Sequence, residues 1–201
     1  MFVTFEGLDG SGKTTQSERL RARLEADGVD VVATREPGGT ELGERIRDLL
    51  LHGGHVSPWA EALLYAASRA QHVEEVIGPA LERGATVVCD RYLDSSVAYQ
   101  GAGRELGLDR VLDLNLTAVG GLLPDRTFFL LLAPGDVPSR LTGEHDRLER
   151  EGDAFRRRVD AGYRELAARY PERIVVLDAA RPVDELAEEV YGAVRGDSRA
   201  G

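Results

Sequence analysis

FVTFEGLDGSGKTT, residues 2–15, decides the fold of this chain. Residues 2–5 are apolar or β-branched, which is typical of a buried strand, and residues 14–26 have the periodicity of a helix. Between them, residues 7–14 match the phosphate-binding pattern G-x-x-x-x-G-K-[ST] without a mismatch. A strand, a glycine-rich turn and a helix in this order predict a P-loop.

The residues of this loop suit the phosphates of a nucleotide. Its glycines let backbone N–H groups converge on phosphate oxygens, near the positive end of the helix dipole. We expect the Lys13 ammonium to contact the β- and γ-phosphates and the Thr14 hydroxyl to ligate Mg²⁺. Lys13 is the one lysine among 25 basic residues, and a compact ammonium is what this position needs. We assign ATP binding here to Gly7, Gly10, Ser11, Gly12, Lys13, Thr14 and Thr15.

Further along the chain, short β-rich runs alternate with stretches of helical periodicity. The expected strands are residues 2–5, 29–33, 86–89, 127–132 and 174–177; the expected helices are 14–26, 41–51, 58–82, 93–100, 108–119, 154–170 and 183–194. Nearly continuous apolar runs are typical of strands in a parallel sheet that is covered on both faces. The pattern predicts an α/β fold of the P-loop NTPase type, a doubly wound five-stranded parallel sheet flanked by helices.

We expect one domain over residues 1–195 and a frayed polar tail over 196–201. Residues 134–152 are rich in arginine, glycine and acidic side chains, and Pro138 and Gly143 interrupt any long helix. This composition predicts a mobile lid, with an ordinary surface loop as the alternative.

Composition limits the partners of the protein. A net charge of −10 argues against a nucleic-acid partner, because nucleic-acid backbones favour basic surfaces. No window approaches the run of about 18 apolar residues that a membrane span needs. The single cysteine, Cys89, excludes an internal disulfide and follows apolar strand residues, so we expect a buried residue and a cytoplasmic protein.

A P-loop indicates nucleotide binding and leaves the reaction open. A GTPase would need N-K-x-D for guanine, which a chain with one lysine cannot supply. The L-S-G-G-Q-like segment of transporter ATPases is also absent. A kinase remains, and the rest of the chain must then define the acceptor.

Five segments, read together, resemble thymidylate kinases from Phe2 to about Val190. They are FEGLDG (5–10), TREPGGT (34–40), LLYAASRAQH (63–72), DRY with SSVAYQG (90–92 and 95–101) and DRLE (146–149). The first segment is generic, whereas the other four are specific in this order and spacing. The resemblance implies the transfer of the γ-phosphate of ATP to dTMP, with Mg²⁺ as cofactor, by a homodimer.

The resemblance also implies a site for dTMP. Arg35 follows a predicted strand and would grip the acceptor phosphate, with an ion pair to Glu36 as the alternative. Tyr65 and Arg69 share a helix face, where an aromatic ring would stack on thymine beside a donor to its O4. A tyrosine in the core beside a solvated arginine is the alternative for this pair. The full expected set is Asp9, Arg35, Tyr65, Arg69, Arg91, Ser96, Tyr99 and Gln100.

Further roles follow from the same match. Asp90 would hold Mg²⁺ together with Thr14, and Arg91 would lie near the acceptor phosphate. Asp9 would contact the sugar 3′-hydroxyl or lie near the metal. Ser96 would contact the thymine edge, and Tyr99 would crowd the 2′ position of the sugar and so favour a deoxyribose.

Catalysis requires cations on the transferring phosphate. We expect Lys13, Asp9 and Arg91 to act in catalysis. Thymidylate kinases carry an arginine either inside the P-loop or in the lid. Because residues 8–11 here carry no cation, the resemblance implies an arginine from the lid, in the order Arg147, Arg140 and Arg150. For Arg147, which belongs to the DRLE segment, a structural role is the alternative. Ala180 and Arg181 occupy the place where such kinases surround adenine, with a helix-starting turn as the alternative.

Two other functions remain alternatives. One is a kinase for another pyrimidine nucleotide or for a deoxynucleoside. The other is a non-catalytic P-loop protein that senses nucleotides, which gives no reason for Arg35, Arg91 and an arginine-bearing lid to surround a second phosphate.

Overall fold

Strand β1 (Phe2–Glu6) lies at the centre of a five-stranded parallel sheet with the order β2-β3-β1-β4-β5. The other strands are β2 (Val31–Arg35), β3 (Thr86–Asp90), β4 (Arg126–Leu131) and β5 (Ile174–Asp178). The computed structural model describes residues 1–137 and 146–197. The predicted α/β fold with a parallel sheet of five strands is confirmed.

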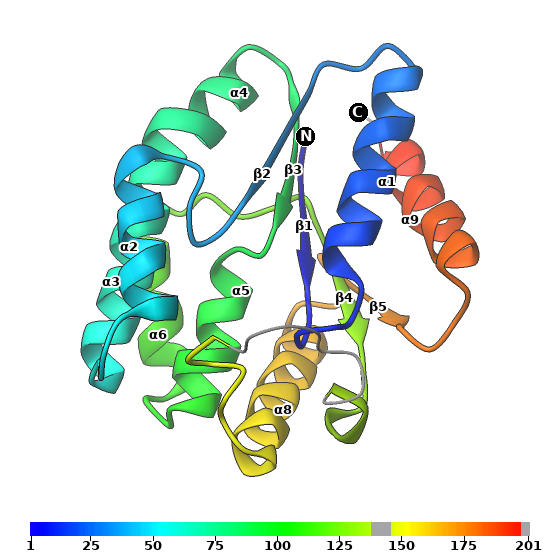
Figure 1. Cartoon of the computed structure of the whole chain (residues 1–201). Helices are drawn as coiled ribbons and strands as arrows, with labels where there is room; N and C mark the ends of the chain where they lie inside the picture. The colour runs from blue at the N-terminus through cyan, green and yellow to red at the C-terminus, as the bar shows by residue number, and fades with distance from the viewer. Residues whose placement is uncertain (138–145, 198–201) are drawn as a thin grey trace.

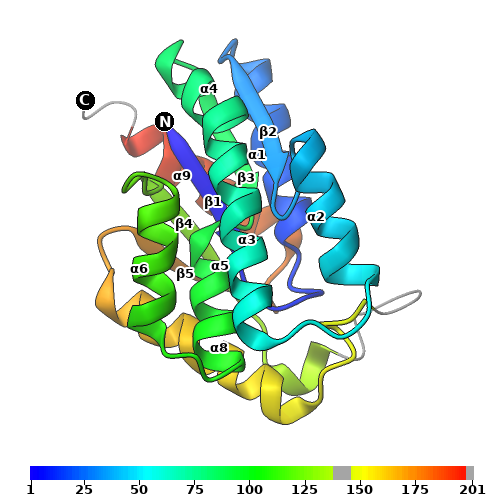
Figure 2. The same ribbon diagram turned by 90° about the vertical axis from the view of Figure 1, so that its left-hand side faces the viewer.

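Helices cover both faces of the sheet. Figure 1 shows α1 and α9 together on one side and α2 to α6 on the other, with α8 beneath the lower ends of the strands. Figure 2 shows α3, α5 and α6 side by side over the second face. The helices are α1 (Lys13–Ala26), α2 (Glu41–His52), α3 (Pro58–His72), α4 (Gly78–Glu82), α5 (Leu93–Ser96), α6 (Leu108–Ala118), α8 (Asp153–Arg169) and α9 (Val183–Asp197).

The core is built where apolar strand residues meet the helices. The rings of Phe5 and Phe128 stack at 5.4 Å between neighbouring strands, and Phe129 stacks on Tyr163 of α8 at 4.9 Å. All four side chains are buried. Aromatic pairs of this kind add to the stabilisation that burial itself provides. The core therefore supports the sheet directly below the P-loop.

Several element boundaries differ from those predicted. Strand β2 begins and ends two residues later than expected, because its pairing with β3 runs from Val31 to Arg35. The expected helix over 58–82 contains a π-helical turn at Val73–Ile77, and the one over 93–100 continues as a π-helix over Val97–Gly103. Residues 138–145 of the expected lid over 134–152 lie outside the described residues.

The C-terminal helix α9 runs to Asp197, two residues beyond the expected domain boundary at 195. In the described part of the chain, none of the helices has the length and apolar character that crossing a membrane requires.

Gly7, at the start of the P-loop, is tightly packed, and Gly192, which has open space around it, serves as a comparison. A Cβ on Gly7 would lie 2.5 Å from the Leu130 carbonyl oxygen, at a φ of +141° that favours glycine. Gly192 lies in α9 with open space around it. We expect Gly7→Ala to lower the free energy of unfolding by about 2 kcal/mol or more, and Gly192→Ala to raise it by about 0.5–1 kcal/mol. Urea unfolding measures both, and equal stability of Gly7→Ala and wild type would contradict this packing.

Candidate active site

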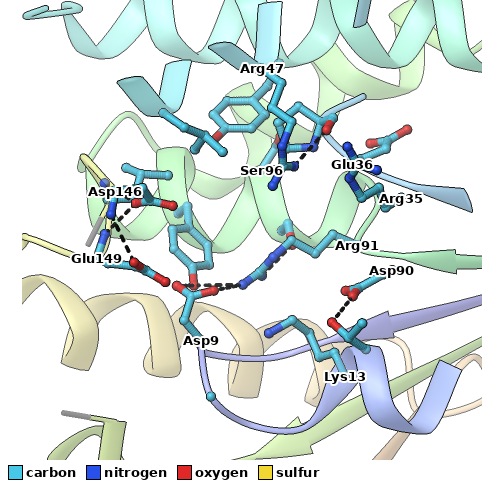
Figure 3. A pocket seen from close by; sticks show the side chains of 18 of the residues that line it. Asp9, Lys13, Arg35, Glu36, Arg47, Asp90, Arg91, Ser96, Asp146 and Glu149 are labelled. Atoms are coloured by element: carbon cyan, nitrogen blue, oxygen red, sulfur yellow. Dashed lines mark hydrogen bonds and ion pairs between the residues drawn. The ribbon is translucent and has the colours of Figure 1, made fainter. Parts of the chain in front are cut away.

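A cavity of about 540 Å³ opens at the carboxyl ends of β1, β2 and β3. Parallel α/β sheets bind ligands at this edge, where the strand order reverses around β1. Side chains of the P-loop form one wall, and residues that follow β2 and β3 form another (Figure 3). Residues of α2, α3 and the segment 146–149 complete the lining.

The P-loop takes the shape that its sequence predicts. Gly10 and Gly12 have φ angles of +76° and +92°, which only glycine adopts at little cost. The Lys13 ammonium is buried and donates to the Leu8 carbonyl oxygen at 2.8 Å. Burial and the nearby Arg91 lower the pKa of Lys13 to about 8, with nearby carboxylates opposing the shift. A phosphate at this position would supply the anionic partner that a buried ammonium needs.

Thr14 and Asp90 meet at the edge of the cavity. The Thr14 hydroxyl donates to Asp90 Oδ2 at 2.6 Å, as the dashed line in Figure 3 marks. The other carboxylate oxygen, Oδ1, is buried and has no hydrogen-bond partner in the described part of the chain. A hydroxyl and one carboxylate with a free oxygen fit Mg²⁺, which takes few protein ligands beside substrate phosphates. Among residues 1–137 and 146–197 there is no group of three or more metal-binding side chains.

Arg91 is the central cation of the cavity. It forms an ion pair with Asp9, and its Nη1 donates to the Gly7 carbonyl oxygen at 3.0 Å. Tyr99 donates from its hydroxyl to the second oxygen of Asp9 at 3.1 Å. Burial opposes ionisation of Asp9, but Arg91 and Lys13 outweigh it and hold the pKa of Asp9 below its usual value. The pair therefore stays charged in the absence of substrate.

The backbone of Arg91 has a φ of +70°, in the left-handed region that non-glycine residues rarely enter. Such conformations cost of order 1–3 kcal/mol and cluster at functional sites. The turn directs the chain from β3 into α5 and leaves the Arg91 guanidinium pointing toward Asp9 (Figure 3).

The far wall consists of an ordered polar network around Arg69. Its guanidinium is 1% exposed and donates to Glu36 at 2.7 Å, to Ser96 at 3.0 Å and to Asn115. His72 contacts the second oxygen of Glu36 at 3.0 Å. Arg69 is therefore fixed by several partners rather than solvated, while still lining the cavity.

Arg35 ends β2 and does not pair with Glu36, the alternative partner that the sequence suggested. Both oxygens of Glu44 accept from Arg35 Nη2, at 3.0 and 3.1 Å, and this pair is half-exposed. Arg47 lies beside it, half-buried, and donates to the Pro37 carbonyl oxygen at 2.9 Å. Two guanidiniums therefore line the mouth of the cavity on the side opposite the P-loop.

Most of the site residues predicted from the sequence line this one cavity. Those that do are Asp9, Gly10, Gly12, Lys13, Thr14, Thr15, Arg35, Tyr65, Arg69, Asp90, Arg91, Ser96, Tyr99 and Gln100. Gly7, Ser11, Ala180 and Arg181 do not appear in the lining. Arg181 instead pairs with Glu189 at 2.6 Å, on the surface.

The structure describes two of the three lid arginines that the sequence names as candidates. Arg140 lies outside the described residues. Arg147 does not line the cavity: its guanidinium pairs with the fully buried Glu61 at 2.6 Å and donates to the Leu50 carbonyl oxygen at 2.8 Å. Arg150 is exposed. In this arrangement Arg147 ties the C-terminal part of the expected lid to α2 and α3.

Sequence reasoning missed several lining residues, namely Glu36, Arg47, Ser95, Asp146 and Glu149. Three of these residues have a signal in the sequence. Glu36 flanks the Arg35 position, and Asp146 and Glu149 belong to the DRLE segment. The contacts of Ser95 depend on the distant strand β1, so no local pattern reveals them.

The sequence is similar to those of known proteins. A family model described as thymidylate kinase matches residues 5–190. The thymidylate kinase of Bifidobacterium longum is 52% identical over 202 residues, covering 98% of this chain and 96% of that protein. The thymidylate kinase of Clavibacter michiganensis is 54% identical over 194 residues, covering 94% and 92%.

A solved structure gives the same result in three dimensions. The crystal structure of thymidylate kinase from Ehrlichia chaffeensis matches with a TM-score of 0.79 and 35% identity, covering 97% of this chain and 98% of the other. At this coverage and identity, the two chains share the same fold. The chain belongs to the thymidylate kinase family.

Proposed function

We propose that the protein transfers the γ-phosphate of ATP to dTMP and forms dTDP and ADP. The observation that carries this proposal is one continuous cavity in which Lys13 and Thr14 of the P-loop face Arg35, Tyr65 and Arg91. A protein that only binds ATP needs no second set of cations opposite its P-loop. Two phosphate sites in one cavity suit a transfer from one nucleotide to another.

On the donor side, the P-loop holds ATP. Backbone N–H groups of the loop and the N-terminus of α1 bind phosphate oxygens, and Lys13 neutralises the β- and γ-phosphates. Little covalent chemistry is required of the protein, because phosphoryl transfer depends on position and charge. The acceptor is already an anionic phosphate, so no general base is needed.

On the acceptor side, Arg35 and Arg91 hold the monophosphate of dTMP. Arg35 is paired with Glu44 in this structure, so phosphate binding exchanges one anion for another on the same guanidinium. Tyr65 stacks on thymine, and Arg69, held by Glu36, donates to its O4. Ser96 and Gln100 lie beside this base site, and both are buried.

Thr14 and Asp90 are the residues that would hold Mg²⁺, because their oxygens fit its preference for hard ligands. When bound, the ion neutralises charge on the donor phosphates. We place Asp9 next to the sugar of the acceptor, where Arg91 keeps it ionised.

We also propose a cytoplasmic homodimer and single-domain organisation. Four large apolar side chains remain exposed on adjacent helices α2 and α3: Leu42, Leu49, Trp59 and Leu63, between 37% and 55% exposed. Exposed apolar residues on adjacent helices suit a contact between two copies. The buried, single cysteine suits a reducing compartment.

A panel of acceptors tests the proposed function. With ATP and Mg²⁺, we expect turnover with dTMP to exceed that with dUMP, dCMP, thymidine and the ribose analogue of dTMP. Coupled measurement of ADP and direct separation of the nucleotide products identify the acceptor. Preferred turnover of thymidine itself would favour the deoxynucleoside kinase, and turnover of none would favour a nucleotide sensor.

The P-loop assignment predicts an effect of Lys13 on the reaction and not on folding. Lys13→Ala should lower kcat by about two to three orders of magnitude, since it removes the charge on the phosphates. Lys13→Arg should rescue little, because a planar guanidinium does not fit the place of a compact ammonium. Circular dichroism verifies folding, and near-normal turnover by folded Lys13→Ala would refute the assignment.

Tyr99 is predicted to set the choice of sugar. Its ring is held against Phe155 and Tyr163, at centroid distances of 6.1 and 6.3 Å. Wild type should prefer dTMP over its ribose counterpart by at least about tenfold in kcat/KM. Tyr99→Phe keeps the ring and should keep this preference, whereas Tyr99→Ala should relax it. Equal use of both sugars by wild type would rule out steric exclusion.

A lid arginine is predicted to supply the missing catalytic cation. Among Arg140→Ala, Arg147→Ala and Arg150→Ala, at least one variant should lose about 10³-fold in kcat while substrate affinities stay within about tenfold. Stopped-flow kinetics measures kcat, and titration calorimetry measures the substrate affinities.

Glu61→Gln is the companion variant for Arg147, because it weakens the ion pair that holds this arginine. Glu61 also accepts from Gln100 at 2.9 Å and pairs with Arg104 at 3.2 Å. If Glu61→Gln reproduces the loss seen in Arg147→Ala, the loss comes from the contacts of Glu61 and not from a phosphate contact of Arg147. Normal turnover in all single variants and in the triple variant would place the cation outside the lid.

A further inference from the structure

Glu6, the last residue of β1, is a fully buried carboxylate directly behind the cavity. Four hydrogen bonds reach it. Its Oε1 accepts from the backbone N–H groups of Tyr92 and Ser95, at 2.8 and 3.2 Å. Its Oε2 accepts from the Ser95 hydroxyl at 2.5 Å and from the Tyr163 hydroxyl at 2.8 Å. Buried carboxylates of this kind are retained where every oxygen has partners.

The same two hydroxyls also contact Arg91. Arg91 Nη1 donates to Ser95 Oγ at 3.2 Å and to Tyr163 Oη at 3.4 Å. Both hydroxyls donate to Glu6 Oε2, so the lone pairs of each remain for donors such as Arg91 Nη1, which is shared with the Gly7 carbonyl oxygen. The two hydroxyl oxygens also lie 3.0 Å apart, within hydrogen-bond distance of each other. Glu6 therefore sets the direction of both hydroxyls that support Arg91.

The backbone gives a second, independent link. Arg91 occupies the left-handed region, and the next N–H along the chain, that of Tyr92, is the one bound at 2.8 Å by Glu6. On the other side, the Arg91 N–H donates to the Phe5 carbonyl oxygen at 2.9 Å. The end of β1 thus holds the unfavourable turn from both sides, and strain of this kind persists only where neighbours fix it.

We propose that Glu6 is a positioning residue for phosphoryl transfer, which holds the Arg91 guanidinium toward the acceptor phosphate through the hydroxyls of Ser95 and Tyr163. This inference rests on the proposed function in one respect: it assumes that Arg91 binds the phosphate of dTMP. Burial raises the pKa of Glu6 to about 7, with Asp94 adding to the shift and Arg91 opposing it. The four hydrogen-bond donors around Glu6 stabilise its ionised carboxylate.

The isosteric variant Glu6→Gln tests the proposal. Its amide nitrogen is a donor, so at least one hydroxyl must turn its hydrogen away from residue 6, toward Arg91 or the other hydroxyl, and the support of the guanidinium is weakened. We expect kcat/KM for dTMP to fall by about ten- to a hundredfold, the range seen when a supporting shell is removed. The ratio of thymidine Kd to dTMP Kd should fall as well, because Arg91 is then displaced from the phosphate. The affinity for ATP should change by less than about threefold.

Asp94→Asn is the matched control. Asp94 is another buried carboxylate on α5, but it pairs with Arg173 at 2.6 Å and contacts neither hydroxyl. The same carboxylate-to-amide change there should lower stability, measured by urea unfolding, and leave kcat/KM and the binding ratio within about twofold of wild type. An equal loss of activity in Asp94→Asn and Glu6→Gln would overturn the proposal, because it would indicate general loosening of α5.

A double-mutant cycle tests the route through the hydroxyls. In the background Ser95→Ala with Tyr163→Phe, adding Glu6→Gln should lower kcat/KM by less than about threefold, since the hydroxyls that it turns are already gone. An undiminished effect of Glu6→Gln in that background would overturn the proposed route. If Glu6→Gln does not fold, Tyr163→Phe decides: it keeps the stacked ring, and normal kcat/KM and an unchanged binding ratio in that variant would overturn the proposal.

Failure of the proposed function would look different. Wild type that neither binds nor phosphorylates dTMP would refute that function and leave Glu6 to be decided by a crystal structure of Glu6→Gln. An Arg91 guanidinium displaced from Asp9 would support the positioning role. A guanidinium in its wild-type place would overturn it.

Discussion

The parallel pairing of β1 between β3 and β4 is the constraint on which the site depends. In this register Phe5 lies opposite Asp90, so the chain leaves β1 toward the P-loop and leaves β3 toward Arg91 at the same edge of the sheet. Because both strands run in one direction, their carboxyl ends meet, and residues more than 70 positions apart, such as Thr14 and Asp90, come within hydrogen-bond distance. The positions of the P-loop, of the Thr14–Asp90 pair and of Arg91 therefore follow from one strand alignment.

Charge is arranged so that a strongly acidic protein can hold two anionic substrates. The chain carries a net charge of −10, yet Lys13, Arg35, Arg47, Arg69 and Arg91 all line one cavity. Each of the four arginines is held by a nearby oxygen, from Asp9, Glu36, Glu44 or the Pro37 carbonyl. The partners differ in burial: Glu36 is buried with Arg69, whereas Glu44 and Arg35 are both half-exposed. Under the proposed function, this exposure lets Arg35 exchange Glu44 for a phosphate. Pre-arranged cations of this kind need little reorganisation when charge shifts between substrates.

Much of this could be predicted from the sequence, and the limits have physical causes. The strands, their parallel direction and the P-loop follow from local patterns, because buried parallel strands are apolar throughout and the loop has a strict residue pattern. The π-helical turns at Val73–Ile77 and Val97–Gly103 could not be predicted, because tertiary packing rather than propensity sets them. The supporting residues were also missed. Glu6 and Glu61 read as ordinary acidic residues, and their importance appears only when distant segments bring Ser95, Tyr163 and Arg147 against them.

The central claim is that one cavity passes a phosphoryl group directly between two nucleotides. A single-turnover rapid-quench experiment with ATP labelled in its γ-phosphate, excess enzyme and unlabelled dTMP tests it most directly. The label should appear in dTDP at the rate at which ADP forms, with no lag and no inorganic phosphate. ADP formation that leaves the label in inorganic phosphate, or that proceeds equally well without dTMP, would contradict the claim.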